Sequence, residues 1–212
     1  LYLDLNVIRD SLSSAPQETD VDRDERLVTI TLPMPDGSNQ RFGIFESAIM
    51  APGLAAKYPQ IKTYAGQGLD DPTISTRLDL TPKGFHAILF TPDGTIYIDP
   101  LFKDNLAYYA SYHREDYLPR DGDVFYEPQV MALAHDLRDA FPAGVNTSQL
   151  AVSSGAQLRT YRLALAATGE YTQYHGGEVA DALAAQVVAM NRVNGIYERE
   201  VAIRMVLIPN ND

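Results

Sequence analysis

The sequence predicts an α+β protein in which a mostly antiparallel, β-rich domain precedes a β-α-β unit. Residues 1–118 contain several short apolar runs of period two, and turns rich in Pro, Asp and Gly separate them. That pattern is typical of an antiparallel sheet with small helices. Residues 158–212 contain two β-type apolar runs on either side of one long segment of helical period. This second pattern indicates two parallel strands joined by a crossover helix.

The first domain is expected to consist mainly of hairpins. Leu1 to Leu5 alternates in polarity and predicts a short strand, and Asn6 is expected to cap a helix that ends before Pro16. Two of the predicted hairpins contain a Pro-Asp-Gly turn. The remaining expected elements are strands near 27–32, 41–46, 61–64, 74–80, 85–90, 95–98 and 108–114, and a short helix near 50–58.

The β-α-β unit is expected to be an unfinished sheet. Leu158 to Ala167 and Val201 to Ile208 predict strands, and the segment from Glu178 to Glu200 predicts a helix about 30 Å long at 1.5 Å per residue. A stripe at spacings of three and four marks the buried face of that helix: Val179, Leu183, Val187, Met190, Val193, Asn194 and Tyr197. Parallel strands need cover on both faces, and one helix covers one face. We therefore expect further polypeptide on the other.

Composition restricts the class of protein. The net charge of −11 argues against a nucleic-acid partner and against docking on anionic lipid. No apolar run approaches the roughly 20 residues of a membrane span. Cysteine is absent, which excludes disulfides and thiolate zinc ligands. Residue 1 is leucine and no secretory signal follows it, so we expect either a removed signal peptide or a numbering that starts within a longer chain.

Three segments of the last 55 residues carry a resemblance to a known family: LRTYRLALAATGEYT, VADALAAQVVAMNRVNGIYERE and AIRMVLIPNND. They resemble the opening of the catalytic domain of secreted bacterial reprolysin-like zinc metallopeptidases, of the metzincin clan. FESAIMAPGLAAKYPQIKTYAGQG and DLTPKGFHAILFTPDGTIYIDP are similar to the propeptide of the same proteins. The resemblance implies a propeptide domain at 1–118, a linker at 119–157 with a helix near 128–141, and the incomplete start of a catalytic domain at 158–212.

The zinc signature of that family, H-E-x-x-H-x-x-G-x-x-H, is absent from the sequence. The resemblance places it beyond Asp212, so zinc would belong to the full-length protein, and no catalytic residue is nominated. A propeptide can silence such a peptidase by supplying a zinc ligand, for which His113, Glu115 and Asp116 are the candidates, or by covering the cleft. The alternative interpretation of this charged cluster is a solvated face.

The remaining acidic and histidine residues give weaker indications of function than the cluster at 113–116. A calcium loop would use Asp20, Asp22 and Asp24, but the glycine turn and distal glutamate of an EF-hand are missing. His86 is predicted at the surface of a strand and His175 in a turn.

The implied partners are the protein's own catalytic domain and protein or peptide substrates, in a secreted or cell-surface bacterial setting. One alternative is a non-catalytic, β-rich binding or structural module. The other is a cleaved propeptide that stays attached to its protease.

Overall fold

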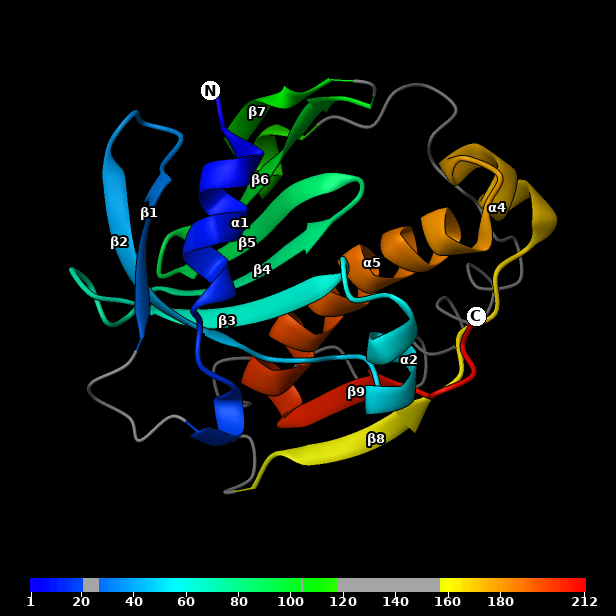
Figure 1. Cartoon of the computed structure of the whole chain (residues 1–212). Helices are drawn as coiled ribbons and strands as arrows, with labels where there is room; N and C mark the ends of the chain where they lie inside the picture. Colours follow the sequence, from blue (N-terminus) through cyan, green and yellow to red (C-terminus); the bar gives the residue numbers. More distant parts are fainter. Residues whose placement is uncertain (21–26, 104, 118–156) are drawn as a thin grey trace, which may run out of the picture.

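The computed structural model describes residues 1–20, 27–103, 105–117 and 157–212. It contains a curled antiparallel sheet, a long helix that crosses this sheet, and a two-stranded parallel sheet on the other side of the helix (Figure 1). The α+β class predicted from the sequence is confirmed. The predicted linker helix at 128–141 lies outside the described residues.

The antiparallel sheet has seven strands, and each strand pairs with its neighbours in the sequence. The first hairpin pairs Val28 with Ile44 at one end and Pro33 with Asn39 at the other. Gly37 (φ +85°) and Gly94 (φ +135°) sit in hairpin turns, where a positive φ favours glycine. The strands are β1 (Val28–Pro33), β2 (Asn39–Glu46), β3 (Lys62–Gly68), β4 (Ser75–Thr81), β5 (Gly84–Thr91), β6 (Gly94–Phe102) and β7 (Asn105–His113).

The N-terminal residues differ from the prediction. Helix α1 (Leu5–Ser13) begins two residues earlier than expected, because the carboxylate of Asp4 accepts a hydrogen bond from the amide of Asn6 at 2.9 Å and caps it. The predicted strand at 1–5 is therefore reduced to a bridge between Tyr2 and Tyr108. The sequence also did not reveal the short helices η1 (Glu18–Asp20), η2 (Arg114–Asp116) and α4 (Gly169–His175), whereas α2 (Pro52–Lys57) was expected.

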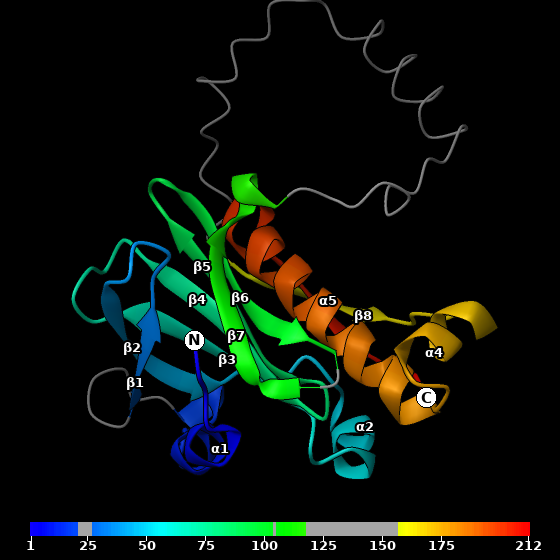
Figure 2. The same cartoon turned by 90° about the horizontal axis from the view of Figure 1, so that it is seen from above.

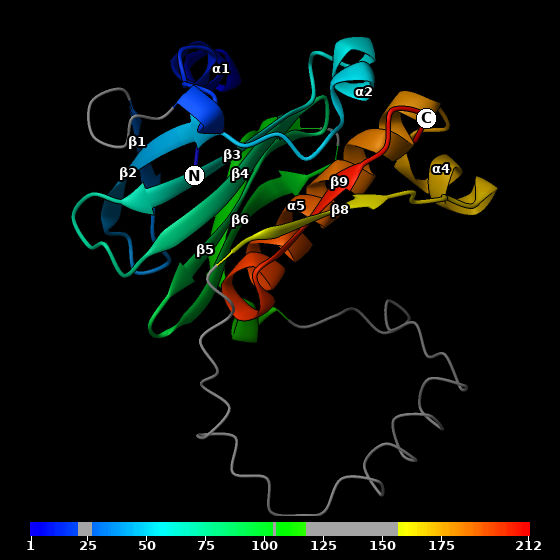
Figure 3. The same cartoon turned by 90° about the horizontal axis from the view of Figure 1, so that it is seen from below.

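The β-α-β unit is present and its strands are parallel, as predicted. Strand β8 (Arg159–Leu163) pairs with β9 (Ile203–Leu207), and Arg159 lies opposite Ile203. Helix α5 (Val179–Val201) connects them after α4 and ends at Ala202, which adopts the left-handed conformation. The second and third views show α5 between the antiparallel sheet and the β8–β9 pair (Figures 2 and 3).

Two hydrophobic cores hold these layers. The first lies in the antiparallel sheet under α1 and includes Leu12, Phe42 and Leu89. The second lies between the two parts of the chain, because residues of 49–61 pack there with Leu183 and Leu207. The β-α-β unit therefore shares its core with the preceding domain.

Cover on the β8–β9 pair is incomplete in the described chain. The outer edge of β9 is occupied, since the amide of Leu207 donates to Ile49 O at 2.8 Å and that of Ala51 donates to Leu207 O at 2.9 Å. Four of the five residues of β8 are exposed, and Tyr161 keeps 50% of its surface. The preceding domain thus covers one side of the unit and leaves β8 open.

Candidate functional site

Buried charges join the antiparallel sheet to α5. Arg77 is 3% exposed, and its guanidinium lies 2.5 Å from both carboxylate oxygens of Glu198 on α5. A second guanidinium nitrogen donates to Asn191 Oδ1 at 3.2 Å. Alternation over residues 74–80 places Arg77 and Asp79 on one face, a pattern typical of a half-buried strand. The polar face is nevertheless buried, because α5 covers it and Asp79 is only 1% exposed.

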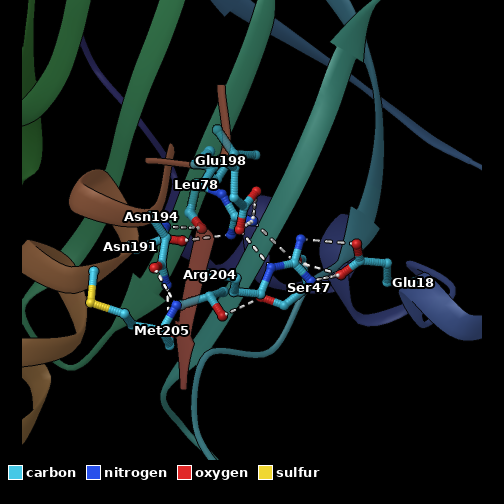
Figure 4. A network of polar contacts seen from close by, with 10 residues as sticks. Glu18, Ser47, Leu78, Asn191, Asn194, Glu198, Arg204 and Met205 are labelled. Carbon is cyan, nitrogen blue, oxygen red and sulfur yellow. Dashed lines mark hydrogen bonds and ion pairs between the residues drawn. The ribbon is translucent and has the colours of Figure 1, made fainter. Parts of the chain in front are cut away.

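The ion pair continues into β9 and η1. Arg204 Nε lies 2.5 Å from Glu198, and its two terminal nitrogens lie 2.6 and 3.0 Å from the carboxylate of Glu18. The hydroxyl of Ser47 donates to Glu18 at 2.8 Å. Figure 4 shows these contacts, which form a four-charge cluster of Arg77, Glu198, Arg204 and Glu18. Its charges alternate in sign, so each buried ion has a partner, as burial of charge requires.

The surroundings of Arg77, Arg204 and Glu18 shift the pKa of each group. Burial lowers the pKa of Arg77, while the carboxylate of Glu198 opposes that change. Burial alone would lower the pKa of Arg204, but hydrogen bonds with Glu18 and Glu198 outweigh it and raise that pKa. Burial alone would likewise raise the pKa of Glu18, but the guanidinium of Arg204 outweighs it and the pKa falls below its ordinary value of 4.5.

Acidification is therefore expected to weaken the cluster. A carboxyl whose pKa is depressed in the folded state stabilises the fold above its unfolded pKa, and this contribution is lost as the pH falls through the folded value. Thermal unfolding at a series of pH values should show Glu18→Gln less stable than the unmodified protein at neutral pH. The two midpoints should converge as the pH drops below 4.5. A constant difference at every pH would contradict the assignment.

Two buried asparagines bind α5 to both sheets. Asn191 donates to Leu78 O of β4 at 2.8 Å. Asn194 donates to Met205 O and accepts from Met205 N, each at 2.8 Å, so it pairs with β9 as another strand would. These bonds fix the position of α5 relative to β4 on one side and to β9 on the other.

A cleft of about 890 Å³ lies beside this interface, between β6, β7 and η2 on one wall and α4 and α5 on the other. His86 lines it and is 12% exposed, with Nδ1 2.8 Å from Asp79 Oδ1. The prediction of a sheet-surface residue is therefore wrong for His86. His175 closes α4 and contacts the rings of Tyr171 and Tyr174.

The candidate latency residues lie at the end of β7. Glu115 and Asp116 are exposed in η2, and His113 is half-buried. Within the described ranges, no three His, Asp or Glu side chains are close enough to hold a metal ion, so these residues do not form a zinc or calcium site by themselves. Of the calcium candidates, Asp22 and Asp24 fall outside the described residues and Asp20 belongs to η1.

A model of the reprolysin-like metallo-peptidase family M12B matches residues 157–212, which are 56 of the 212 residues. No curated protein and no solved structure gives a match. The match covers the β-α-β unit and indicates a metallopeptidase, a class of hydrolase that generally uses zinc. None of the helices in the described part of the chain has the length and apolar character of a membrane span.

Proposed function

We propose that this chain is the N-terminal portion of a secreted bacterial zinc endopeptidase precursor. In this proposal, residues 1–118 are the propeptide domain, and residues 158–212 begin the catalytic domain. The observation that carries it is the placement of the peptidase-like segment. That segment forms a parallel β-α-β unit, shares a core with residues 49–61, and leaves β8 exposed.

The propeptide domain would assist folding by supplying contacts that the β-α-β unit lacks. Ile49, Leu54 and Ile61 fill the core against α5, and the four-charge cluster fixes the orientation of the helix. The exposed strand β8 offers an edge to which a further strand of a catalytic domain can pair. With these contacts in place, the β-α-β unit would fold before the rest of the catalytic domain pairs with it.

The same docking supports a role in latency. Two routes are proposed. The propeptide domain could cover the active-site cleft of the peptidase, or His113, Glu115 or Asp116 could supply a ligand to the open coordination position of the metal. The exposed ends of Glu115 and Asp116 are available to a metal held on neighbouring polypeptide. In the full-length protein, zinc would activate a water for attack on the peptide bond, with residues outside this chain as its ligands and general base.

The experiment uses the precursor with the polypeptide that follows Asp212. We expect about one zinc ion per chain by elemental analysis, little hydrolysis of casein before maturation, and hydrolysis after limited cleavage within 142–155. The chain 1–212 alone should be inactive. A precursor without zinc and without activity after cleavage would instead favour a non-catalytic binding module.

A triple variant separates the two latency routes. His113→Ala, Glu115→Ala and Asp116→Ala together should raise the activity of the uncleaved precursor if one of them ligates the metal. Asp10→Ala, which removes an exposed carboxylate from α1, serves as the control. Unchanged latency in the triple variant would leave steric cover as the mechanism.

A further inference from the structure

We propose that the cleft between β6–β7 and α4–α5 binds an extended acidic peptide of about eight residues. The inference is independent of peptidase activity, because it rests on the shape and charge of a cleft that described residues line. Its volume of about 890 Å³ falls within the range of roughly 300–1,000 Å³ that is typical of ligand sites. Both the antiparallel sheet and the helices supply its walls.

The cleft is cationic although the chain is acidic. The protein has a net charge of −11, yet one acidic residue, Asp99, and four basic ones line this cleft: Lys83, Lys103, Arg114 and Arg192. Lys83 is paired with Asp181 at 2.6 Å, and Arg192 is paired with Asp99. Among the described residues, no carboxylate forms an ion pair with Lys103 or Arg114. These two cations are therefore available to an anionic ligand.

The positive potential already acts on a neighbouring histidine. Burial, followed by the charges of Lys103 and Lys83, lowers the pKa of His175. Across the cleft, Asp79 holds the ring of His86 in a fixed orientation. The lining is thus preorganised, which reduces the entropy cost of binding.

The positions of Lys103 and Arg114 favour a peptide over a small anion. Lys103 comes just before β7 and Arg114 just after it, and a nine-residue strand spans roughly 30 Å at about 3.3 Å per residue. A free carboxylate cannot reach both ends of such a groove. About eight residues of extended peptide span roughly 26 Å at the same rise, which brings a carboxylate near each cation.

Aromatic rings line the cleft beside each of the two cations. Tyr97, Tyr112 and Tyr117 form a tyrosine row with centroid separations of 5.8 and 6.2 Å, and the hydroxyl of Tyr112 donates to Asp99 at 2.7 Å. Tyr117 is 57% exposed, and Tyr174, which stacks under Lys103, is 67% exposed. Tyrosine and arginine are the residues that most often anchor protein partners. Aromatic or apolar residues next to the carboxylates of the peptide would pack on these rings.

The test is calorimetric titration of the chain 1–212 with a blocked octapeptide that has two glutamates at each end and Ala-Tyr-Ala-Tyr between them. Its counterpart with four glutamines should bind at least about tenfold weaker, and free glutamate should not compete. Lys103→Gln with Arg114→Gln should weaken binding of the acidic peptide by about tenfold. Arg9→Gln with Arg41→Gln removes the same charge from exposed positions in α1 and β2, and should leave affinity unchanged.

A nuclear magnetic resonance titration provides a second readout, because a bound carboxylate should raise the pKa of His175. The proposal is overturned if the acidic peptide does not bind, if the glutamine peptide binds equally well, or if both double variants lose affinity alike. Equal affinity for free glutamate would replace the peptide with a small anion. None of these outcomes bears on zinc or casein hydrolysis, so the proposed peptidase function is tested separately.

Discussion

Replacing Arg77 by alanine is expected to lower the free energy of unfolding by about 3–5 kcal/mol, the usual cost of leaving a buried charge without its partner. The guanidinium is 3% exposed and lies between Glu198, Asn191 and Ser47. Without it, the carboxylate of Glu198 keeps Arg204 as its only cationic contact in the four-charge cluster. Urea denaturation followed by circular dichroism measures the change.

Arg41→Ala is the matched control for Arg77→Ala. Arg41 also forms an arginine–carboxylate pair, with Asp70, but its side chain is 60% exposed and solvent screens the interaction. The urea midpoint of Arg41→Ala should therefore stay close to that of the unmodified protein. Adding Glu198→Gln to Arg77→Met should cost less than the two single changes combined, because the pair couples. Equal losses for Arg77→Ala and Arg41→Ala would show that the cluster does not hold α5.

The antiparallel sheet was predictable because its determinants are local. Alternation and glycine turns specify hairpins between neighbouring segments, and every strand of the sheet pairs with the next one in the sequence. The long helix was predictable for the same reason, since its stripe repeats over six turns. Helix α4 was missed because its seven residues lie between Thr168 and the pair Gly176–Gly177, which resemble a loop.

The interface was not predictable because its partners are distant in sequence. Alternation in β4 shows that Arg77 and Asp79 share a face, but it does not show that a helix more than 100 residues later will cover it. Glu18 and Arg204 are 186 residues apart, and neither stands in a motif. The one available signal was an arginine and an aspartate on the same face of an alternating strand, which indicates paired rather than solvated charge only once the covering helix is known.

Replacing Gly195 by leucine is expected to destabilise the protein by about 3 kcal/mol, at the upper end of the cost of overpacking. Gly195 is buried where α5 crosses β5, and a Cβ there would lie 2.8 Å from two ring carbons of Phe90. The ring is itself 5% exposed, so it has little room to move. Helix propensity alone predicts the opposite sign, because leucine favours a helix by nearly 1 kcal/mol over glycine. The sign of the change in the thermal unfolding midpoint therefore shows whether overpacking or helix propensity dominates.

Gly169→Leu, in α4, is the control, because no atom lies within 4 Å of a Cβ built there. It should be neutral or slightly stabilising. Combining Gly195→Leu with Phe90→Ala removes the ring that the new side chain meets, so the double variant should lose less stability than the sum of the single variants. Strict additivity would mean that α5 does not press on β5 in solution, and the docking on which the propeptide proposal depends would fail with it. A favourable coupling would establish that the long helix of the peptidase-like segment and the preceding sheet fold as one packed unit.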